Sequence, residues 1–458
     1  MKKVHFIGIG GTGISAIARM LLERGWRVSG SDLRSSPYFE AVTALGAQTV
    51  LGHAPALAKT ADLVVRSSAV RDDDPEVRAA RENGIPVLKR SEFLPVLTEG
   101  YQVIAVAGSH GKTTTTAMLV QCLRSGGSEV NFILGADIKE LGKNAQAADN
   151  PAFVIEADEY DYMFLGLQPL VSVVTNIEYD HPDFFHSPEV YTQAFADFIN
   201  QTRPEGSVLL CADDEGILAM LENCDLLPKQ MLSYGFRDGA DYQIINHRLV
   251  PGGQRFELSI HGQTPLGPFE LNLPGRFNVL NAAAALASAH IYGSDLSACA
   301  KALAAFEGTS RRFDLVYQNA NWMVINDYGH HPSQLSQTIE GAHQLYPDHT
   351  IWAVWEPHTV SRTRLLRHQF AQALAQADRS VILRLYGARE ADDSFSPADI
   401  AQEAGKENSR YLPENQAAVE HILANRTGKD LVIVFSAGNG PEFARQLVGQ
   451  LSKEQKND

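Results

Sequence analysis

Cysteine is scarce in this sequence: it has four in 458 residues and no CxxC pair, so neither a disulfide framework nor a thiolate zinc site is indicated. Positive charge is also in deficit, because 39 basic residues face 54 acidic ones and the net charge is −15. Such a chain repels polyphosphate backbones, which excludes broad nucleic-acid binding. No stretch approaches the ~20 apolar residues that cross a bilayer, and no cleavable leader is recognisable. We therefore expect a cytoplasmic protein without membrane insertion.

The length predicts roughly three globular domains of about 150 residues each. Apolar β-branched runs alternate with helical patterns, which is typical of the α/β class with parallel sheets covered on both faces. The order strand, glycine turn, helix occurs at the N-terminus and again from Tyr101, and a third series of strands begins at Trp322. Between Tyr242 and Pro274 the alternating pattern predicts an antiparallel insertion. The expected domains are residues 1–98, 99–309 and 310–458.

The first glycine turn has the GxGxxG spacing typical of dinucleotide folds. Gly8, Gly10 and Gly13 follow an expected strand directly and open a helix, and Asp32 ends the next strand. Glycines let the backbone approach a pyrophosphate, and the N–H groups at the helix start bind its charge. Any diphosphate meets these conditions, so NAD is only one candidate, and an ordinary tight turn would need the same glycines.

A second glycine turn, GSHGKTT, lies between a strand and a helix and predicts a phosphate loop. Its backbone amides would surround the phosphates, the Lys112 ammonium would face the β and γ oxygens, and the Thr113 hydroxyl would ligate Mg²⁺. The usual spacing has a glycine five residues before Gly111, where this chain has Val106, so the loop is the shorter GxxGKT. The residues of the expected loop are Gly108, Ser109, His110, Gly111, Lys112, Thr113 and Thr114.

Two strands of the second domain end in clusters of acidic residues. In a parallel sheet these carboxyl ends lie beside the phosphate loop, where Mg²⁺ finds the oxygen ligands it prefers. Some of the acids must be ordinary solvated loop residues, and a single histidine there is as compatible with a structural role. The candidates are Glu156, Asp158, Glu159 and Asp161 after one strand, and Glu178, Asp180 and His181 after the other.

Two polar pairs follow farther along the chain. Asn278 and Asn281 are three residues apart on a helix of small residues, so both amides share a face, where they would read an adenine edge or act as helix caps. Arg311 and Arg312 lie at the expected domain junction, a suitable place for a guanidinium that reaches phosphate when domains close. Exposed arginines are also common at such junctions.

Two histidine-bearing segments of the third domain, DYGHHP (327–332) and PHTVSR (357–362), both follow strands. Both are therefore expected at the edge of the sheet where ligands of α/β proteins bind. Paired histidines with flanking arginines suit a substrate that carries a carboxylate, because arginine offers that group a planar fork.

Together these motifs resemble the Mur ligase family, whose members join amino acids to UDP-linked muramic acid in bacterial peptidoglycan synthesis. HFIGIGGTGISAIA, AGSHGKTTTT, VIEADEYD, TNIEYDH, RFNVLNA, RRF, NDYGHHP and PHTVSRT occur in the family's order over essentially the whole chain. GHHP and PHxxSRT are similar to the member that joins L-alanine to UDP-N-acetylmuramate. Tyr160 is instead shared with the member that reattaches recycled murein tripeptide, and that activity is the second candidate function. The absence of lysine from residues 182–202 argues against the later ligases.

The resemblance implies a Rossmann-like N-terminal domain, a P-loop ATPase-like central domain and a Rossmann-like C-terminal domain. It implies that ATP phosphorylates the muramoyl carboxylate, and that the amino group of L-alanine attacks the acyl phosphate while Mg²⁺ offsets the repulsion between the anions. The implied catalytic residues are Lys112, His330, His331 and Arg362. The implied UDP-sugar site is Gly10, Gly11, Thr12, Gly13, Asp32, Ser67 and Ser68. For ATP the phosphate loop is joined by Asn278, Asn281, Arg312 and Asp327. The implied metal ligands are Thr113 and Glu156 for one Mg²⁺ and His181 for a second Mg²⁺. The implied amino-acid site is His358 and Arg362.

Two residues depart from the family's pattern. Phe277 stands where histidine is frequent, so adenine contact would rest on stacking and the asparagines. Thr359 stands where the alanine ligases commonly have arginine, which leaves Arg362, with Arg364 as a second candidate, for the alanine carboxylate. Two other classes are possible: an NAD-dependent oxidoreductase, in which the GKTTTT segment has no role, and a nucleotide-gated scaffold protein, which needs neither His330 nor Arg362. The oligomeric state is left open.

Overall fold

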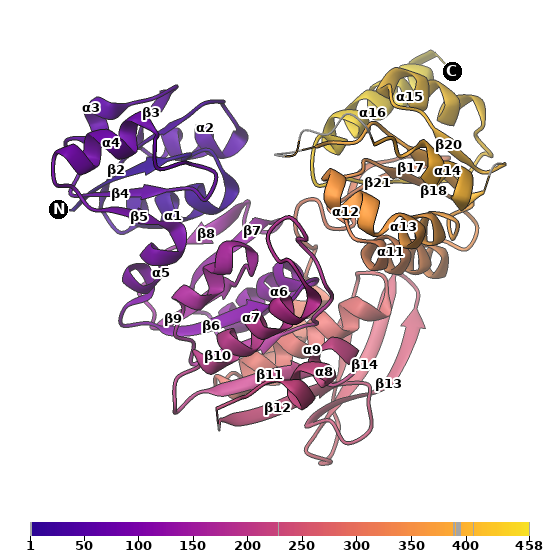
Figure 1. Cartoon of the computed structure of the whole chain (residues 1–458). Coiled ribbons are helices and arrows are strands. Elements are labelled where there is room, and N and C mark those ends of the chain that lie inside the picture. The colour runs from indigo at the N-terminus through magenta and orange to yellow at the C-terminus, as the bar shows by residue number, and fades with distance from the viewer. Residues whose placement is uncertain (1, 228, 388–389, 391–394, 406, 458) are drawn as a thin grey trace.

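Three sheets with flanking helices succeed one another along the chain in the computed structural model (Figure 1). The structure describes residues 2–227, 229–387, 390, 395–405 and 407–457. The expected α/β class is confirmed, because mostly parallel strands alternate with helices in all three domains. None of the described helices combines the length and the apolar character that crossing a membrane requires.

The first sheet is parallel throughout, with the order β3-β2-β1-β4-β5. Its central strand is buried on both faces, because Phe6 packs with Ile14 and Ile17 on one side and Ile7 packs with Val77 on the other. The strands are β1 (Lys3–Ile7), β2 (Arg27–Asp32), β3 (Gln48–Leu51), β4 (Leu63–Arg66) and β5 (Val87–Lys89). The helices are α1 (Thr12–Glu23), α2 (Pro37–Ala44), α3 (Pro55–Ala58), α4 (Pro75–Glu82) and α5 (Arg90–Thr98).

The central sheet has ten strands in the order β15-β14-β13-β12-β11-β10-β6-β9-β7-β8. Strand β6 has an almost continuous apolar sequence and lies between β9 and β10, as expected for a parallel strand that is covered on both faces. The strands are β6 (Gln102–Ala107), β7 (Asn131–Ile138), β8 (Lys143–Gln146), β9 (Ala152–Glu156), β10 (Val171–Val174), β11 (Ser207–Cys211), β12 (Gln230–Gly235), β13 (Tyr242–Val250), β14 (Gly253–Ile260) and β15 (Leu266–Leu271). The helices are α6 (Lys112–Arg124), the 3₁₀ helix η1 (Tyr160–Gly166), α7 (Pro188–Asn200), α8 (Glu215–Asn223), α9 (Arg276–Ile291) and α10 (Leu296–Ala304).

The edges of the central sheet are antiparallel. The expected insertion is present, because β13 pairs with β14 and β14 with β15 in antiparallel register. The hairpin of β7 and β8 at the other edge was not predicted. Strand β8 has the sequence KNAQ, which lacks the β-branched and aromatic residues that indicate a strand.

The third sheet has the order β16-β17-β21-β18-β19-β20, and separate apolar clusters pack on its two faces. Its innermost strands β17, β21 and β18 are parallel, so the segments that follow β17 and β18 begin at the same edge. The strands are β16 (Asp314–Gln318), β17 (Trp322–Asp327), β18 (Thr350–Trp355), β19 (Arg379–Ile382), β20 (Ser409–Tyr411) and β21 (Asp430–Phe435). The helices are α11 (Pro332–Leu345), α12 (Val360–Leu365), α13 (Arg367–Leu374), α14 (Ala398–Ala404), α15 (Asn415–Ala424) and α16 (Gly440–Asn457).

Candidate active site

A cleft of about 520 Å³ is lined by residues from all three domains. Thr12 and Gly13 reach it from the first glycine turn, Lys112 and Thr113 from the phosphate loop, and Arg362 from the C-terminal domain. The cleft therefore contains part of each of the three expected groups, those for a sugar nucleotide, for ATP and for an amino acid. The expected residues that do not line it include Gly10, Gly11, Asp32, Ser67, Ser68, Asn278, Asn281 and Asp327.

The phosphate loop connects β6 to α6 in a conformation that requires glycine at Gly111. This residue has a φ of +82°, and a Cβ added to it would lie 2.4 Å from Oδ1 of Asn281 on α9. Asn281 also accepts a hydrogen bond from Thr115 Oγ1 at 3.2 Å, so α6 and α9 meet directly behind the loop. The start of α6, with its free N–H groups, faces the cleft and is a suitable anion site.

Lys112 forms a buried ion pair with Glu159. Its Nζ donates to Glu159 Oε2 at 2.8 Å and to the carbonyl oxygen of Gly108 at 2.5 Å. Burial alone would lower the pKa of Lys112 and raise that of Glu159, but their mutual attraction raises the pKa of the lysine and, with His181, lowers the pKa of the carboxyl to about 2. Both groups are therefore charged at neutral pH, and a cation is held ready at the loop.

The three expected metal ligands lie around the same loop. Thr113 Oγ1 donates to Glu156 Oε1 at 2.9 Å, and the other oxygen of Glu156 accepts from the backbone N–H of Gly135 at 2.6 Å. His181 has a φ of 56°, and its Nε2 lies 3.6 Å from Glu159 Oε1. The Thr113 hydroxyl and the Glu156 carboxylate are the kind of oxygen donors that fit Mg²⁺, with water and phosphate oxygens completing the ligands. The imidazole of His181 is a separate nitrogen donor beside Glu159.

A smaller cavity of about 60 Å³ adjoins the phosphate loop and lies between the central and C-terminal domains. Asn278 Nδ2 donates to the carbonyl oxygen of Pro274 at 2.7 Å, and its Oδ1 accepts from Asn281 Nδ2 at 3.1 Å. Asp327 accepts from the backbone N–H groups of Phe313 and Gly329, which holds the domain junction in place. The lining includes Gly111, Phe277, Asn278, Asn281, Arg312 and Asp327, so the expected adenine-side residues are brought together.

The first glycine turn is held by protein groups on both of its sides. Asp32 Oδ2 accepts from the Gly10 N–H at 2.9 Å, and a Cβ added to Gly13 would lie 1.9 Å from Nη1 of Arg90. Arg90 in turn donates from Nη2 to Asp158 Oδ2 at 3.2 Å, which links α5 to the central domain. Ser67 follows β4 beside this turn, with its N–H bonded to the Ile7 carbonyl, and Ser68 and Gly11 are exposed next to it.

The histidines and the arginine of the C-terminal domain meet a carboxylate of the central domain. Arg362 Nε donates to Asp180 Oδ1 at 2.7 Å, and His330 Nε2 lies 3.7 Å from the other oxygen of Asp180. His358 Nδ1 lies 3.5 Å from Arg362 Nη1. Burial, followed by the charge of Arg362, lowers the pKa of His330 to about 3, so this imidazole is neutral at physiological pH. His331 is directed instead at Glu178, with its Nδ1 3.4 Å from Oε1.

Comparisons with known proteins agree with this geometry along the whole chain. Residues 3–102 match the Mur ligase family, catalytic domain; residues 106–289 match the Mur ligase middle domain; and residues 311–438 match the Mur ligase, glutamate ligase domain. The UDP-N-acetylmuramate–L-alanine ligase of Syntrophomonas wolfei is 37% identical over 451 residues, which cover 98% of this chain and 97% of that one. Its counterpart in Chloroflexus aggregans is 39% identical and covers 99% of both chains.

The chain belongs to the Mur ligase family. Among solved structures, the UDP-N-acetylmuramate–alanine ligase of Thermotoga maritima matches it with a TM-score of 0.83, at 26% identity and over 99% of this chain and 100% of that one. A murein peptide ligase from Psychrobacter arcticus shares the fold, with a TM-score of 0.70 at 23% identity and 98% coverage of both chains.

Two tyrosines in or behind this Mur ligase cleft carry no distinctive sequence signal. Tyr191 of α7 is fully buried behind the phosphate loop, and its hydroxyl lies 2.8 Å from Ser109 Oγ and 3.5 Å from Glu159 Oε1. Tyr38 of α2 lines the cleft from the N-terminal domain, and burial raises its pKa to about 12. Neither tyrosine belongs to a motif or follows a strand, so only the folded structure brings Tyr191 to the phosphate loop and Tyr38 to the cleft.

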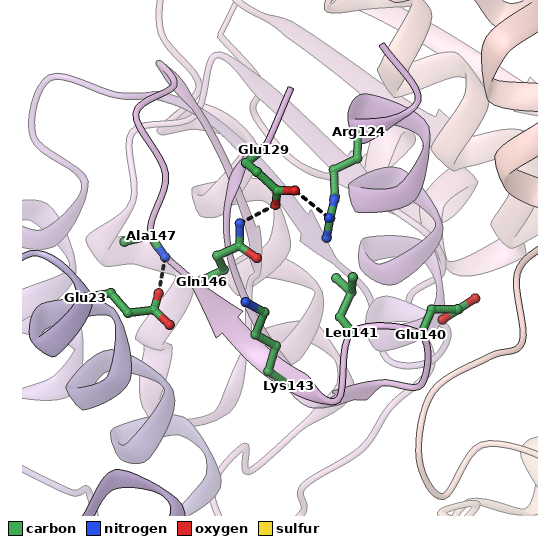
Figure 2. Close-up of a pocket in the computed structure, with 8 residues that line it drawn as sticks. All are labelled: Glu23, Arg124, Glu129, Glu140, Leu141, Lys143, Gln146 and Ala147. Carbon is green, nitrogen blue, oxygen red and sulfur yellow. Dashed lines mark hydrogen bonds and ion pairs between the residues drawn. The ribbon is translucent and has the colours of Figure 1, made fainter. Parts of the chain in front are cut away.

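A second hollow, of about 480 Å³, lies away from the phosphate loop between α1, α6 and the hairpin of β7 and β8 (Figure 2). Its polar groups are largely bonded to one another. Glu129 pairs with Arg124 Nη2 and accepts from Gln146, and Glu23 accepts from the Ala147 N–H. The arrangement joins the first two domains and directs no convergent set of polar groups at a ligand.

Proposed function

We propose that this Mur ligase joins L-alanine to the carboxylate of UDP-N-acetylmuramate, with ATP as the phosphoryl donor and Mg²⁺ as the cofactor. The observation that carries the proposal is the single cleft to which all three domains contribute. An amide bond between two separate substrates, driven by a third, needs three binding regions that meet at one point. The names of the relatives from Syntrophomonas wolfei and Chloroflexus aggregans support the choice of acid and amino acid.

The roles proposed for the residues follow their positions in the cleft. The turn at Gly10–Gly13, with Asp32, Ser67 and Ser68, would hold the sugar nucleotide. The loop Gly108–Thr114 would hold the phosphates of ATP, with Asn278, Asn281, Arg312 and Asp327 around the rest of the nucleotide. His330, His358 and Arg362 would hold the amino acid, and Thr113, Glu156 and His181 would hold Mg²⁺.

The electrostatics of the cleft suit phosphoryl transfer to a carboxylate followed by attack of an amine. Lys112 supplies fixed positive charge where charge develops on the phosphoryl oxygens, and bound Mg²⁺ would reduce the repulsion between the two anions. His330 is neutral because of its low pKa, so its imidazole is able to accept a hydrogen bond from the incoming ammonium. Arg362 lines the cleft, and its Nη1 and Nη2 each lie 3.5 Å from a histidine nitrogen, that of His358 and that of His181. A substrate carboxylate would replace these long contacts with charge-assisted hydrogen bonds.

The experiment that tests the proposal is phosphate release with UDP-N-acetylmuramate, ATP, Mg²⁺ and one amino acid at a time. L-Alanine should give the fastest release, and omission of either the sugar nucleotide or Mg²⁺ should abolish it. Fastest phosphate release with the recycled murein tripeptide would instead favour the ligase that reattaches this tripeptide to UDP-N-acetylmuramate. No release with any amino acid or with the tripeptide would remove the ligase proposal, and reduction of NAD instead would favour an oxidoreductase.

A further inference from the structure

Four side chains form a half-buried interdomain hub, and of these only His110, in the phosphate loop, has a role in the proposed reaction. The hydroxyl of Ser333, on the first turn of α11, donates to Glu178 Oε2 at 2.6 Å and lies 2.9 Å from His331 Nδ1 and 3.3 Å from His110 Nε2. His110 Nε2 is itself 3.0 Å from Glu178 Oε2. We call Ser333, Glu178, His110 and His331 the Ser333 hub.

The hub joins three segments that are distant in sequence. His110 belongs to the phosphate loop, Glu178 belongs to residues 175–181 after β10, and Ser333 and His331 belong to the start of α11 in the C-terminal domain. Asn176, from the same connection as Glu178, also accepts from the His110 N–H at 2.8 Å. Any movement of the C-terminal domain relative to the phosphate loop must therefore break or bend the bonds of this hub.

The arrangement favours a hydrogen-bonded hub over a metal site. His110, Glu178 and His331 each offer a ligand atom within 4.8 Å of the others, which is close enough to surround a metal ion. The Ser333 hydroxyl, however, is within 3.3 Å of a donor or acceptor atom on all three residues. A metal at about 2.0–2.2 Å from these ligands would have to displace that hydroxyl.

The charges in the hub are suited to a permanent contact. Burial alone would raise the pKa of Glu178, but the hydrogen bond and charge of His110, with Ser333 and His331, lower it to about 2. Burial and the neighbouring His110 lower the pKa of His331 to about 4. Glu178 is therefore an anion at neutral pH, and it accepts hydrogen bonds at the start of α11, where the helix dipole also favours negative charge.

The hub lies directly beside the groups proposed to bind the amino acid. Gln334 Oε1 accepts from the backbone N–H groups of both His330 and His331, so the two histidines move as one unit with α11. His330 is on the cleft side of this unit, and His331 is on the hub side. The position of the hub therefore sets the position of His330 relative to the phosphate loop.

We infer that Glu178 and Ser333 are positioning residues, which hold the C-terminal domain against the phosphate loop. In this position the amino acid and the acyl phosphate would lie in reactive geometry. In this role His331 acts through its contact with Glu178 and not on the substrate. The expected kinetic effect rests on the proposed function, but the placement of the C-terminal domain against the phosphate loop is a property of the fold.

The kinetic test compares Ser333→Ala and Glu178→Gln with Ser333→Thr, which keeps the hydroxyl. Ser336→Ala is the matched control, because Ser336 is one turn farther along α11 and bonds to Gln376 within its own domain. Loss of a hydrogen bond to a charged group should lower kcat roughly tenfold or more and raise the KM for the amino acid, while ATP affinity changes less than about twofold. Ser333→Thr and Ser336→Ala should stay within about threefold of the unchanged protein.

A double variant separates a shared hub from two independent contacts. The kcat of Ser333→Ala combined with Glu178→Gln should be no lower than that of the slower single variant, because both substitutions remove the same contact between the domains. Multiplied losses, or normal kinetics in Ser333→Ala, would overturn the inference. A fall in Tm that accounts for the whole loss of activity would also overturn it, since that would mean a merely structural role.

A scattering measurement tests the seating without any ligase activity. Small-angle X-ray scattering with AMP-PNP and Mg²⁺ should give a larger radius of gyration for Ser333→Ala than for Ser336→Ala, because the C-terminal domain is released. Equal radii would contradict the seating even if the kinetics changed. If the unchanged protein releases no phosphate with any amino acid, the proposed function fails while this measurement still decides the role of the hub.

Discussion

Arg362 of α12 donates from its Nε to Oδ1 of Asp180 at 2.7 Å, and both side chains are almost completely buried although they belong to different domains. The bond fixes one edge of the guanidinium, so that the other edge is directed at the cleft. Burial alone would raise the pKa of Asp180, but the charges of His181 and Arg362 hold it well below its usual range. The pair is thus both a join between domains and part of the proposed amino-acid site.

Replacing Arg362 should therefore affect both stability and substrate binding. Arg362→Ala leaves Asp180 as a buried charge without its main partner, which should cost about 3–5 kcal/mol in unfolding free energy measured with urea. In the fraction that remains folded, the KM for the amino acid should rise far more than that for ATP. The control is Arg364→Ala, because Arg364 is exposed on the same helix and is not among the residues that line the cleft. Equal rises in both KM values would mean that Arg362 only supports the structure.

Lys112 should be essential for turnover. Lys112→Ala removes the fixed charge at the phosphate loop and should lower kcat at least ~10²-fold, as measured by phosphate release. It also leaves Glu159 buried without its ion-pair partner, so Tm should fall, and Lys112→Ala combined with Glu159→Gln should recover part of that fall without recovering activity. A variant with normal turnover would show that the loop is wrongly assigned.

The protein should become less stable as the pH falls below 6.5. The pKa of His330 is lowered to about 3 and that of His331 to about 4, in both cases mainly by burial. The unfolded chain takes up these protons near pH 6.5 and the folded chain only below pH 4, so the stabilisation is complete above pH 6.5 and is lost on acidification. The expected slope is up to about 1.4 kcal/mol per pH unit for each histidine.

Urea unfolding between pH 5 and pH 7.5 measures this slope. His331→Gln should reduce the number of protons taken up on unfolding by about one, because one of the two histidines with a lowered pKa is gone. The slope should fall accordingly. His343→Gln, near the other end of α11, is the matched control for replacing a histidine of this helix by glutamine. A slope that is the same in all three proteins would contradict the assignment of His331 as a neutral buried histidine.

Glu156 should set the requirement for Mg²⁺. Glu156→Gln keeps the acceptor for Thr113 Oγ1 but removes the charge, and it should raise the Mg²⁺ concentration for half-maximal phosphate release at least about tenfold. Glu189→Gln, an exposed carboxylate on α7, should have no effect. Chelation with EDTA should stop release in every variant, and excess Mg²⁺ should restore it. An unchanged Mg²⁺ requirement in Glu156→Gln would exclude this carboxylate as a ligand.

Much of the fold and the phosphate side of the site could be predicted, because the relevant signals are local. Strand, glycine turn and helix are contiguous at Gly108–Lys112, and Glu156 follows its strand at the edge that a parallel sheet shares with that loop. The roles of Glu178 and Asp180 could not be predicted in the same way. Their partners Ser333 and Arg362 are 155 and 182 residues away, and only the relative placement of two domains brings them together.

Asp32 illustrates a second limit of reading motifs. The pattern of a dinucleotide fold places this acidic residue at the end of the second strand, beside the ligand, but here one oxygen of the carboxylate accepts from the Gly10 N–H and the other accepts from the Arg34 N–H. A spacing pattern gives the residue type and its place on the sheet edge. It does not give the number of backbone donors that compete for the same side chain.

Arg90 occupies the space that a side chain on Gly13 would need, and from there it reaches Asp158. Even alanine at this position would push the guanidinium aside and weaken the attachment of the first sheet to the second. The missing side chain of Gly13 therefore leaves room for a contact between the first two domains. A Gly13 variant with poor affinity for the sugar nucleotide would report a weakened domain contact as much as an obstructed phosphate.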